Sequence, residues 1–163
     1  KTAATYAANR RQFGQPIASF GAIQSKLAEM AFRLYATESA LYRVAGSLEA
    51  GEVSHEQRGR VFEQHAVEAS ILKVLASETL QHVLDETVQI HGGNGFVRDY
   101  PVEGWYRDAR VNRIFEGTNE INRLLLAGQL VRRAAKGEVA LIAAARALPD
   151  RLLTLPIAPP DEP

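Results

Sequence analysis

Hydrophobic residues recur at helical spacing along most of this chain. Over residues 22–50 they return at steps of three, four and seven, which predicts one apolar stripe on a long amphipathic helix. A second stripe predicts another long helix over residues 57–90. A third helix is expected to begin after Thr118 or Asn119, both of which are good N-caps. No segment alternates apolar and polar residues as a half-buried strand does, so we expect no sheet.

Glycine and proline mark the ends of these segments. The Ala-rich residues 1–12 predict the last turns of a helix, and glycines and a proline in FGQPIASFG interrupt it. Gly92 and Gly93 stand where a left-handed helix cap is expected, and a short helix is predicted near Trp105. We therefore predict an all-α fold, an antiparallel helix bundle over residues 1–137. Residues 138–163 are expected to form a short helix and a proline-rich tail, a candidate linker to a further region.

The amino-acid composition excludes several classes of protein function. Nineteen basic residues balance nineteen acidic ones, so the chain lacks the basic footprint of a nucleic-acid-binding protein. It has no cysteine, which excludes disulfides, thiolate metal sites and cysteine nucleophiles. No apolar run approaches the roughly 20 residues of a membrane-spanning helix. The chain opens on Lys1 within helical sequence, so we interpret it as a piece of a longer protein whose targeting region lies upstream.

The segment IFEGTNEINR holds the strongest candidate for chemistry. Glu116 stands between Phe115 and Gly117, outside the predicted helix. Apolar surroundings raise the pKa of a carboxylate above its usual value of about 4.3, which makes it a better base near neutral pH. A solvated turn residue before a capped helix explains the same pattern, and spacing alone leaves both interpretations open.

Two further segments could face an anion. The backbone N–H groups of HGGNGF could approach a phosphate, although composition alone favours a helix cap followed by an Asn-Gly turn. The segment follows a helix and lacks both the dinucleotide fingerprint and the P-loop lysine. Arg10 and Arg11 stand at a predicted helix C-terminus, where the helix dipole alone favours cations.

The four histidines do not form a recognisable metal motif. A di-iron bundle repeats Glu-x-x-His on two helices, whereas here His65 precedes Glu68 and Glu78 stands four residues before His82. Neither arrangement repeats. We expect no metal site, and we interpret the histidines as solvated or hydrogen-bonded surface residues.

Five segments stand in a fixed order along the chain: RRQFGQPI, FGAIQSKLAEM, VQIHGGNGF, DYPVE and RDARVNRIFEGTNEINR. In this order and at these spacings they resemble the C-terminal domain of acyl-CoA dehydrogenases. The resemblance runs from Lys1 to about Glu138, with IFEGTNEI as its most specific part. It implies a C-terminal helical bundle with a truncated first helix, from an enzyme that carries one FAD per subunit and assembles as a homodimer or homotetramer.

The resemblance also implies residue roles. Glu116 matches the base that removes the α-proton of the acyl thioester, and its main-chain N–H matches the donor to the thioester carbonyl. Glu116 and Gly117 therefore line the expected substrate site. The residues that match contacts to the FAD pyrophosphate of a neighbouring subunit are Arg10, Phe13, Gln89, Gly92 and Gly93. Those that match contacts to the FAD of the same subunit are Thr118 and Glu120.

The implied function is FAD-dependent α,β-dehydrogenation of fatty acyl-CoA, with electron-transfer flavoprotein as electron acceptor. Gly21, Phe115 and the segment LAGQLVRRAAKGE resemble the very-long-chain branch of the family. The family implies a bacterial cytoplasm or a mitochondrial matrix as location. Two alternatives stay open: an acyl-CoA oxidase, and a helical oligomerisation module that is inert when isolated.

Overall fold

The computed structural model describes residues 1–49 and 55–153, with side chains for 1–49 and 59–153. Within these ranges the fold is all-α, as predicted, apart from one short hairpin. The helices are α1 (Thr2–Asn9), α2 (Gly21–Glu49), α3 (His55–Gln64), α4 (Ala66–His91), α5 (Val102–Ala109), α6 (Asn119–Ala135) and α7 (Leu141–Leu153). The hairpin pairs β1 (Arg11–Gln12) with β2 (Gln15–Pro16), and three 3-10 turns are η1 (Ile17–Ser19), η2 (Gly92–Gly95) and η3 (Arg110–Arg113).

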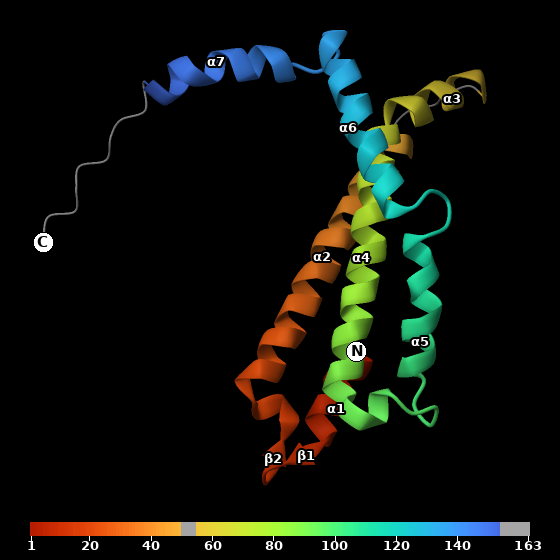
Figure 1. Ribbon diagram of the computed structural model, residues 1–163, viewed down its shortest axis with the longest axis vertical. Coiled ribbons are helices and arrows are strands. Elements are labelled where there is room, and N and C mark those ends of the chain that lie inside the picture. Colours follow the sequence, from red (N-terminus) through yellow and green to blue (C-terminus); the bar gives the residue numbers. More distant parts are fainter. Residues whose placement is uncertain (50–54, 154–163) are drawn as a thin grey trace, which may run out of the picture.

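The helix α4 is the centre of the arrangement (Figure 1). The long helices α2 and α4 run side by side in opposite directions, and α5 returns along another side of α4. The first turns of α6 lie against residues 73–78 of α4, whereas α7 extends away from the bundle (Figure 1). Elements that precede α4 in the sequence and elements that follow it therefore both pack against this helix.

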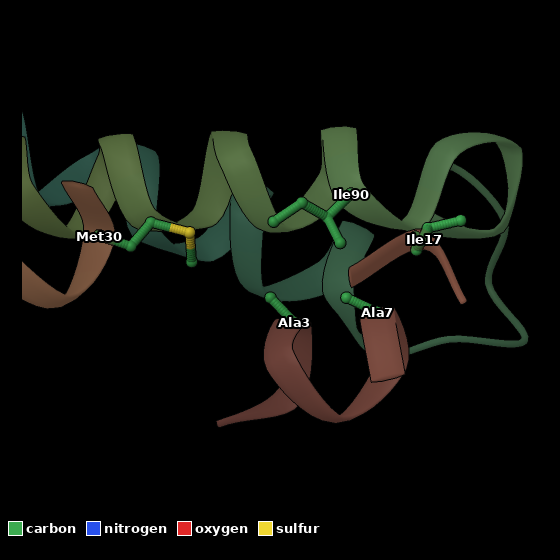
Figure 2. Packing of buried hydrophobic residues seen from close by; sticks show 5 residues of the cluster. All are labelled: Ala3, Ala7, Ile17, Met30 and Ile90. Atoms are coloured by element: carbon green, nitrogen blue, oxygen red, sulfur yellow. The ribbon is translucent and has the colours of Figure 1, made fainter. Parts of the chain in front are cut away.

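The apolar core lies where α1 meets the two long helices. It consists of Ala3, Ala7, Ile17, Met30 and Ile90, which come from four different elements (Figure 2). The two alanines of α1 face the larger side chains, and their small size lets this helix approach α2 and α4 closely. This core fixes the segment that leads from α1 into the hairpin.

The long helices also contact one another through polar side chains. The hydroxyls of Thr37 and Thr79 lie 3.0 Å apart, and Lys26 forms an ion pair with Glu86. Of the apolar stripe predicted along α2, only Met30 is buried, while Leu34 and Leu41 are each 49% exposed. The described residues therefore cover this stripe only in part.

The structure corrects three predicted helix ends. The first helix ends at Asn9 rather than residue 12, because the next residues form the hairpin. The second long helix is two helices, since His65 leaves helical geometry (φ −101°, ψ 11°) between α3 and α4. Gly92 ends α4 with φ 58° and ψ −137°, so it has the positive φ that favours glycine but not the ψ of the expected left-handed cap, and both glycines belong to η2.

The other predicted helices are confirmed within the described residues. The helix near Trp105 is confirmed as α5, and α6 begins after Thr118 as predicted. Gly137 (φ 77°) follows the end of α6, and a short helix, α7, comes after it. The tail at residues 154–163 lies outside the described residues. None of the described helices is both long and apolar enough to cross a bilayer.

Candidate functional site

Glu116 lies in an exposed turn between η3 and α6. Its φ is 53° and that of Gly117 is 83°, so two successive residues occupy the left-handed region. That region is unfavourable for a residue with a side chain and accessible to glycine. Among the described residues, the Glu116 N–H takes part in no backbone hydrogen bond. The turn thus presents a carboxylate and a backbone donor on the same residue.

The described residues do not bury this carboxylate. Glu116 is exposed, and its apolar neighbours Ile114 and Phe115 are themselves about half exposed. The apolar surroundings expected from the sequence are therefore not supplied by the described part of the chain. Such surroundings require another molecule or further protein at this surface.

The N-terminus of α6 begins directly after the turn. Thr118 is the N-cap, and its hydroxyl accepts a hydrogen bond from the N–H of Ile121 at 3.3 Å. The pKa of Glu120 lies below its usual value, because its own backbone N–H and the Thr118 hydroxyl hydrogen-bond to its carboxylate. Thr118 and Glu120 therefore stand beside Glu116 with a clear local role in starting the helix.

Side chains from α4 and α6 hold this turn. Lys73 Nζ donates to the carbonyl of Gly117 and to Asn119 Oδ1, each at 2.8 Å. Asn122 Nδ2 donates to the same Gly117 carbonyl at 2.9 Å. Asn119 is 0% exposed, and its Nδ2 donates to Ser77 Oγ at 3.0 Å. We call Lys73, Ser77, Asn119 and Asn122 the turn-anchoring network.

An ion pair extends this network to the surface. Arg123 Nη2 donates to both oxygens of Glu78 at 2.7 and 2.8 Å, and Asn119 Nδ2 donates to Glu78 Oε1 at 3.2 Å. Burial raises the pKa of Glu78, but the hydrogen bonds from Arg123 and Asn119 and the charges of Arg123 and Arg113 outweigh burial. The pKa of Glu78 therefore lies below its usual value. Arg123 and Asn119 thus supply hydrogen-bond donors to the Glu78 carboxylate, which needs no metal ion as a partner.

A second group of predicted residues meets at the other end of α4. Arg10, Gly92 and Gly93 line a depression of about 340 Å³ between the end of α1, β1 and η2. Arg10 is exposed, and a Cβ added at Gly92 or Gly93 would find no atom within 4 Å. An exposed guanidinium thus stands beside open backbone, which is the arrangement that an anionic group needs.

The floor of this depression is held by an aromatic cluster that the sequence did not predict. The rings of Tyr6 and His91 stack with centroids 4.0 Å apart. Asn94 Nδ2 donates to the hydroxyls of Tyr6 and Tyr100 at 2.8 and 3.3 Å. His91 is 5% exposed, and its Nδ1 lies 2.7 Å from the carbonyl oxygen of Thr87. The prediction that the histidines lie at the surface is wrong for His91.

Two other predicted residues lie near this depression without lining it. Phe13 is at the tip of the hairpin with φ 49°, is 92% exposed, and contacts the ring of Phe20 edge-on at 6.1 Å. Gln89 is exposed near the end of α4, where its carbonyl accepts the N–H of Gly92. Both side chains are open to contact from outside the chain.

The two groups of predicted residues do not form one site within the chain. The turn at Glu116 is attached to α4 at Lys73, whereas the depression lies beyond its last residue, at Gly92. Nineteen residues of helix separate these positions, or roughly 28 Å at 1.5 Å per residue. A single small molecule cannot contact both groups at once at such a separation.

Comparison with known proteins decides the family. The model of the acyl-CoA dehydrogenase C-terminal domain matches residues 1–131. The chain belongs to the acyl-CoA dehydrogenase family. It is 46% identical to a probable acyl-CoA dehydrogenase of Bacillus subtilis, over 98% of this chain and 28% of that protein. It is 45% identical to the bovine mitochondrial very long-chain specific acyl-CoA dehydrogenase, over 78% of this chain and 18% of that enzyme.

A solved structure shows the same fold. A Bacillus anthracis acyl-CoA dehydrogenase, complexed with FAD, superposes with a TM-score of 0.88 and 46% identity. The match covers 99% of this chain and 29% of that enzyme. The chain thus spans less than a third of the length of these acyl-CoA dehydrogenases.

Sequence reasoning missed the turn-anchoring network. Lys73 lies in the apolar segment ILKVLAS, and a lysine inside such a segment is the only signal that the sequence offers. Asn119 was recognised only as a candidate cap. Within the described residues, no three His, Asp or Glu side chains come together in a way that could hold a metal ion.

Proposed function

We propose that this chain supplies the catalytic base for FAD-dependent α,β-dehydrogenation of fatty acyl-CoA thioesters, and that Glu116 is that base. The observation that carries the proposal is the turn itself. It places an exposed carboxylate outside any helix, at an unfavourable backbone conformation held in place by long-range contacts. Strained residues of this kind cluster at functional sites, which favours catalysis over a solvated turn residue.

Glu116 has two tasks in this proposal. Its carboxylate takes the proton from the α-carbon, and its N–H donates to the thioester carbonyl oxygen as negative charge develops there. A proton beside a carbonyl becomes acidic enough to remove only when the resulting oxyanion is stabilised. Gly117 lets the thioester approach the backbone, because no side chain projects from this position.

The residues at both ends of α4 fit a bound FAD. Arg10, with Gly92 and Gly93, offers a cation and open backbone to a pyrophosphate. Phe13 and Gln89 extend that surface, while Thr118 and Glu120 stand beside the base. When bound, FAD accepts the hydride that leaves the β-carbon. The separation of the two groups along α4 supports contacts from each chain to two different FAD molecules, one of them held mainly by a neighbouring subunit.

The whole enzyme is needed for this activity. We propose that it assembles as a homodimer or homotetramer, that it passes electrons to an electron-transfer flavoprotein, and that residues 1–137 form its bundle domain. Resemblance to the very-long-chain branch favours long acyl chains, and the 45% identity with the bovine enzyme supports this choice. Rates with acyl-CoAs of graded length test it.

The test of the base is Glu116→Gln in the full-length enzyme, which keeps the shape and the backbone N–H but cannot accept a proton. Glu29→Gln is the matched control, because Glu29 is an exposed carboxylate of α2 paired with Arg33. Stopped-flow absorbance measures anaerobic flavin reduction by substrate. We expect a decrease of about 10²–10⁴-fold for Glu116→Gln, with FAD content and acyl-CoA affinity unchanged, and no decrease for the control. Flavin reduction at the wild-type rate in Glu116→Gln would place the base elsewhere.

A further inference from the structure

The carbonyl of Gly117 is the point at which the rest of the bundle holds the Glu116 turn. Two side chains from two helices donate to this one oxygen, Lys73 from α4 and Asn122 from α6. Gly117 directly follows Glu116, so bonds to its carbonyl fix the Gly117–Thr118 peptide plane and thereby hold the side of the turn that follows Glu116. Neither donor bonds to the carboxylate itself in the structure.

Lys73 is itself held in one position. Its ammonium also donates to Asn119 Oδ1 at 2.8 Å, and the amide of Asn119 donates to Ser77 and Glu78. Asn119 is wholly buried, and its amide has no alternative contact with water. The lysine is therefore a fixed donor and not a mobile surface cation.

A fixed donor is needed because the backbone conformation of Glu116 is unfavourable. A left-handed residue with a side chain costs about 1–2 kcal/mol. Such a residue persists only where its surroundings determine its conformation. The bonds to Gly117 provide such a constraint from residues 44 and 5 positions away in the sequence.

We propose that Lys73 is a positioning residue for catalysis: it holds the Glu116 carboxylate at the substrate through the Gly117 carbonyl. This inference rests on the proposed role of Glu116 as the base. In this role Lys73 needs no contact with the acyl group or the cofactor. Its loss changes the placement of the base and leaves the chemical identity of the base unchanged. Misplacement of a reacting group by about 1 Å can cost 10²-fold in rate.

The experiment compares Lys73→Met with Lys26→Met in the full-length enzyme. Both substitutions remove an ammonium from a partly buried contact between two segments, but Lys26 pairs with Glu86 between α2 and α4, away from the turn. We expect Lys73→Met to slow anaerobic flavin reduction at saturating acyl-CoA by roughly 10- to 100-fold. FAD content, subunit assembly and acyl-CoA affinity stay unchanged, and Lys26→Met retains the wild-type rate. Lys73→Arg, which keeps a donor, recovers part of the loss.

A double-mutant cycle separates positioning from general stabilisation. If Lys73 acts through Glu116, Lys73→Met has little further effect in a Glu116→Gln background, because the base is already absent. Equal losses in both backgrounds, or a loss of rate that only follows a loss of FAD, would overturn the inference. A normal rate for Lys73→Met beside a slow Glu116→Gln would overturn it while leaving the proposed function intact. A normal rate for Glu116→Gln would instead overturn the proposed function.

A second variant decides the matter if Lys73→Met does not fold. Asn122→Ala removes the other donor to the Gly117 carbonyl from a partly exposed position on α6. We expect slower flavin reduction with normal FAD content. The wild-type rate in this variant would contradict the view that hydrogen bonds to Gly117 place the base.

Discussion

Two turns of this chain share an unusual backbone conformation. Phe13–Gly14 has φ values of 49° and 83°, and Glu116–Gly117 has 53° and 83°. Phe13 and Glu116 are the non-glycine residues with positive φ among those that the structure describes. Both belong to the residues that we propose contact cofactor or substrate. The same unfavourable conformation thus occurs at an aromatic side chain, Phe13, and at a carboxylate side chain, Glu116.

The two turns are held in different ways. The Phe13 turn joins paired strands, as two-residue hairpin loops with positive φ usually do, and Arg11 Nη2 donates to the Gly14 carbonyl three residues away. The Glu116 turn has no paired strands, and its carbonyl bond to Lys73 joins residues 44 positions apart. In our proposal Phe13 adapts to a ligand surface, for which a local hydrogen bond is sufficient. The proposed base, Glu116, needs the rigidity of the packed bundle.

The largest expected effect on stability comes from the centre of the turn-anchoring network. Asn119→Ala leaves Lys73 and Ser77 without their buried partner, and we expect a loss of about 2–4 kcal/mol. Asn112→Ala is the control, because Asn112 makes one local bond, to the Ala109 carbonyl. Circular dichroism of the full-length enzyme should show a clearly lower thermal midpoint for Asn119→Ala. Equal midpoints for the two variants would show that the network adds nothing to the bundle.

Substitutions near the hairpin should weaken FAD retention without changing the rate of proton removal. Arg10→Ala removes a charge-assisted hydrogen bond to the proposed pyrophosphate, typically worth about 1.5–3 kcal/mol. We expect FAD affinity of the full-length enzyme to fall tenfold or more, measured by flavin fluorescence on dilution. An FAD affinity equal to that of the wild type would indicate that Arg10 only compensates the dipole at the end of α1.

Matched glycine substitutions compare the two turns directly. Gly14→Ala and Gly117→Ala each place a side chain at φ 83°, at a cost of about 1–2 kcal/mol. The added Cβ meets nothing within 4 Å at Gly14 but lies 3.1 Å from Asn122 Nδ2 at Gly117. We therefore expect similar losses of thermal stability, with slower flavin reduction at saturating FAD only in Gly117→Ala. Slower reduction of equal size in both variants would remove the distinction between the turns.

The smallest expected effect is the pH dependence of the ion pair between Arg123 and Glu78. Because folding lowers the pKa of Glu78, the pair stabilises the protein above the ordinary glutamate pKa of about 4.3 and this contribution is lost as the pH falls through the lowered value. Both side chains are partly exposed, so the contribution is about 0.2–1 kcal/mol. The thermal midpoints of wild type and Arg123→Met should differ at pH 7 and converge as the pH falls below the ordinary glutamate pKa of about 4.3. A constant difference would contradict this pairing.

The sequence predicted features that local rules control. Helical periodicity located α2, α4 and α6, and cap chemistry limited the N-cap of α6 to Thr118 or Asn119, of which Thr118 is the N-cap. The hairpin was missed because its two-residue strands are too short for a period-two pattern, and a phenylalanine in a left-handed conformation has no sequence signature. The break at His65 was missed because no glycine or proline marks it.

The candidate site was predictable only in part. Motifs made Glu116 and Arg10 candidates, because their neighbours in the sequence carry the pattern. Lys73 acts on a residue 44 positions later, and only the packing of α6 against α4 shows that contact. Burial of His91 likewise depends on Tyr6, which comes from a distant helix. Candidate residues for chemistry could thus be named from the sequence, whereas the residues that contact them from distant parts of the chain could be named only from the fold.

Exchange of the α-hydrogens is the most direct measurement of the central claim, that Glu116 is the base. An acyl-CoA analogue with sulfur in place of the β-carbon has α-hydrogens but no β-hydrogen, so only proton removal and return can occur. In D₂O, proton NMR should show loss of the α-CH₂ signal with the wild-type full-length enzyme. With Glu116→Gln, saturated with the same analogue, we expect this loss to slow by about 10²–10⁴-fold. Exchange at the wild-type rate in Glu116→Gln would contradict the account.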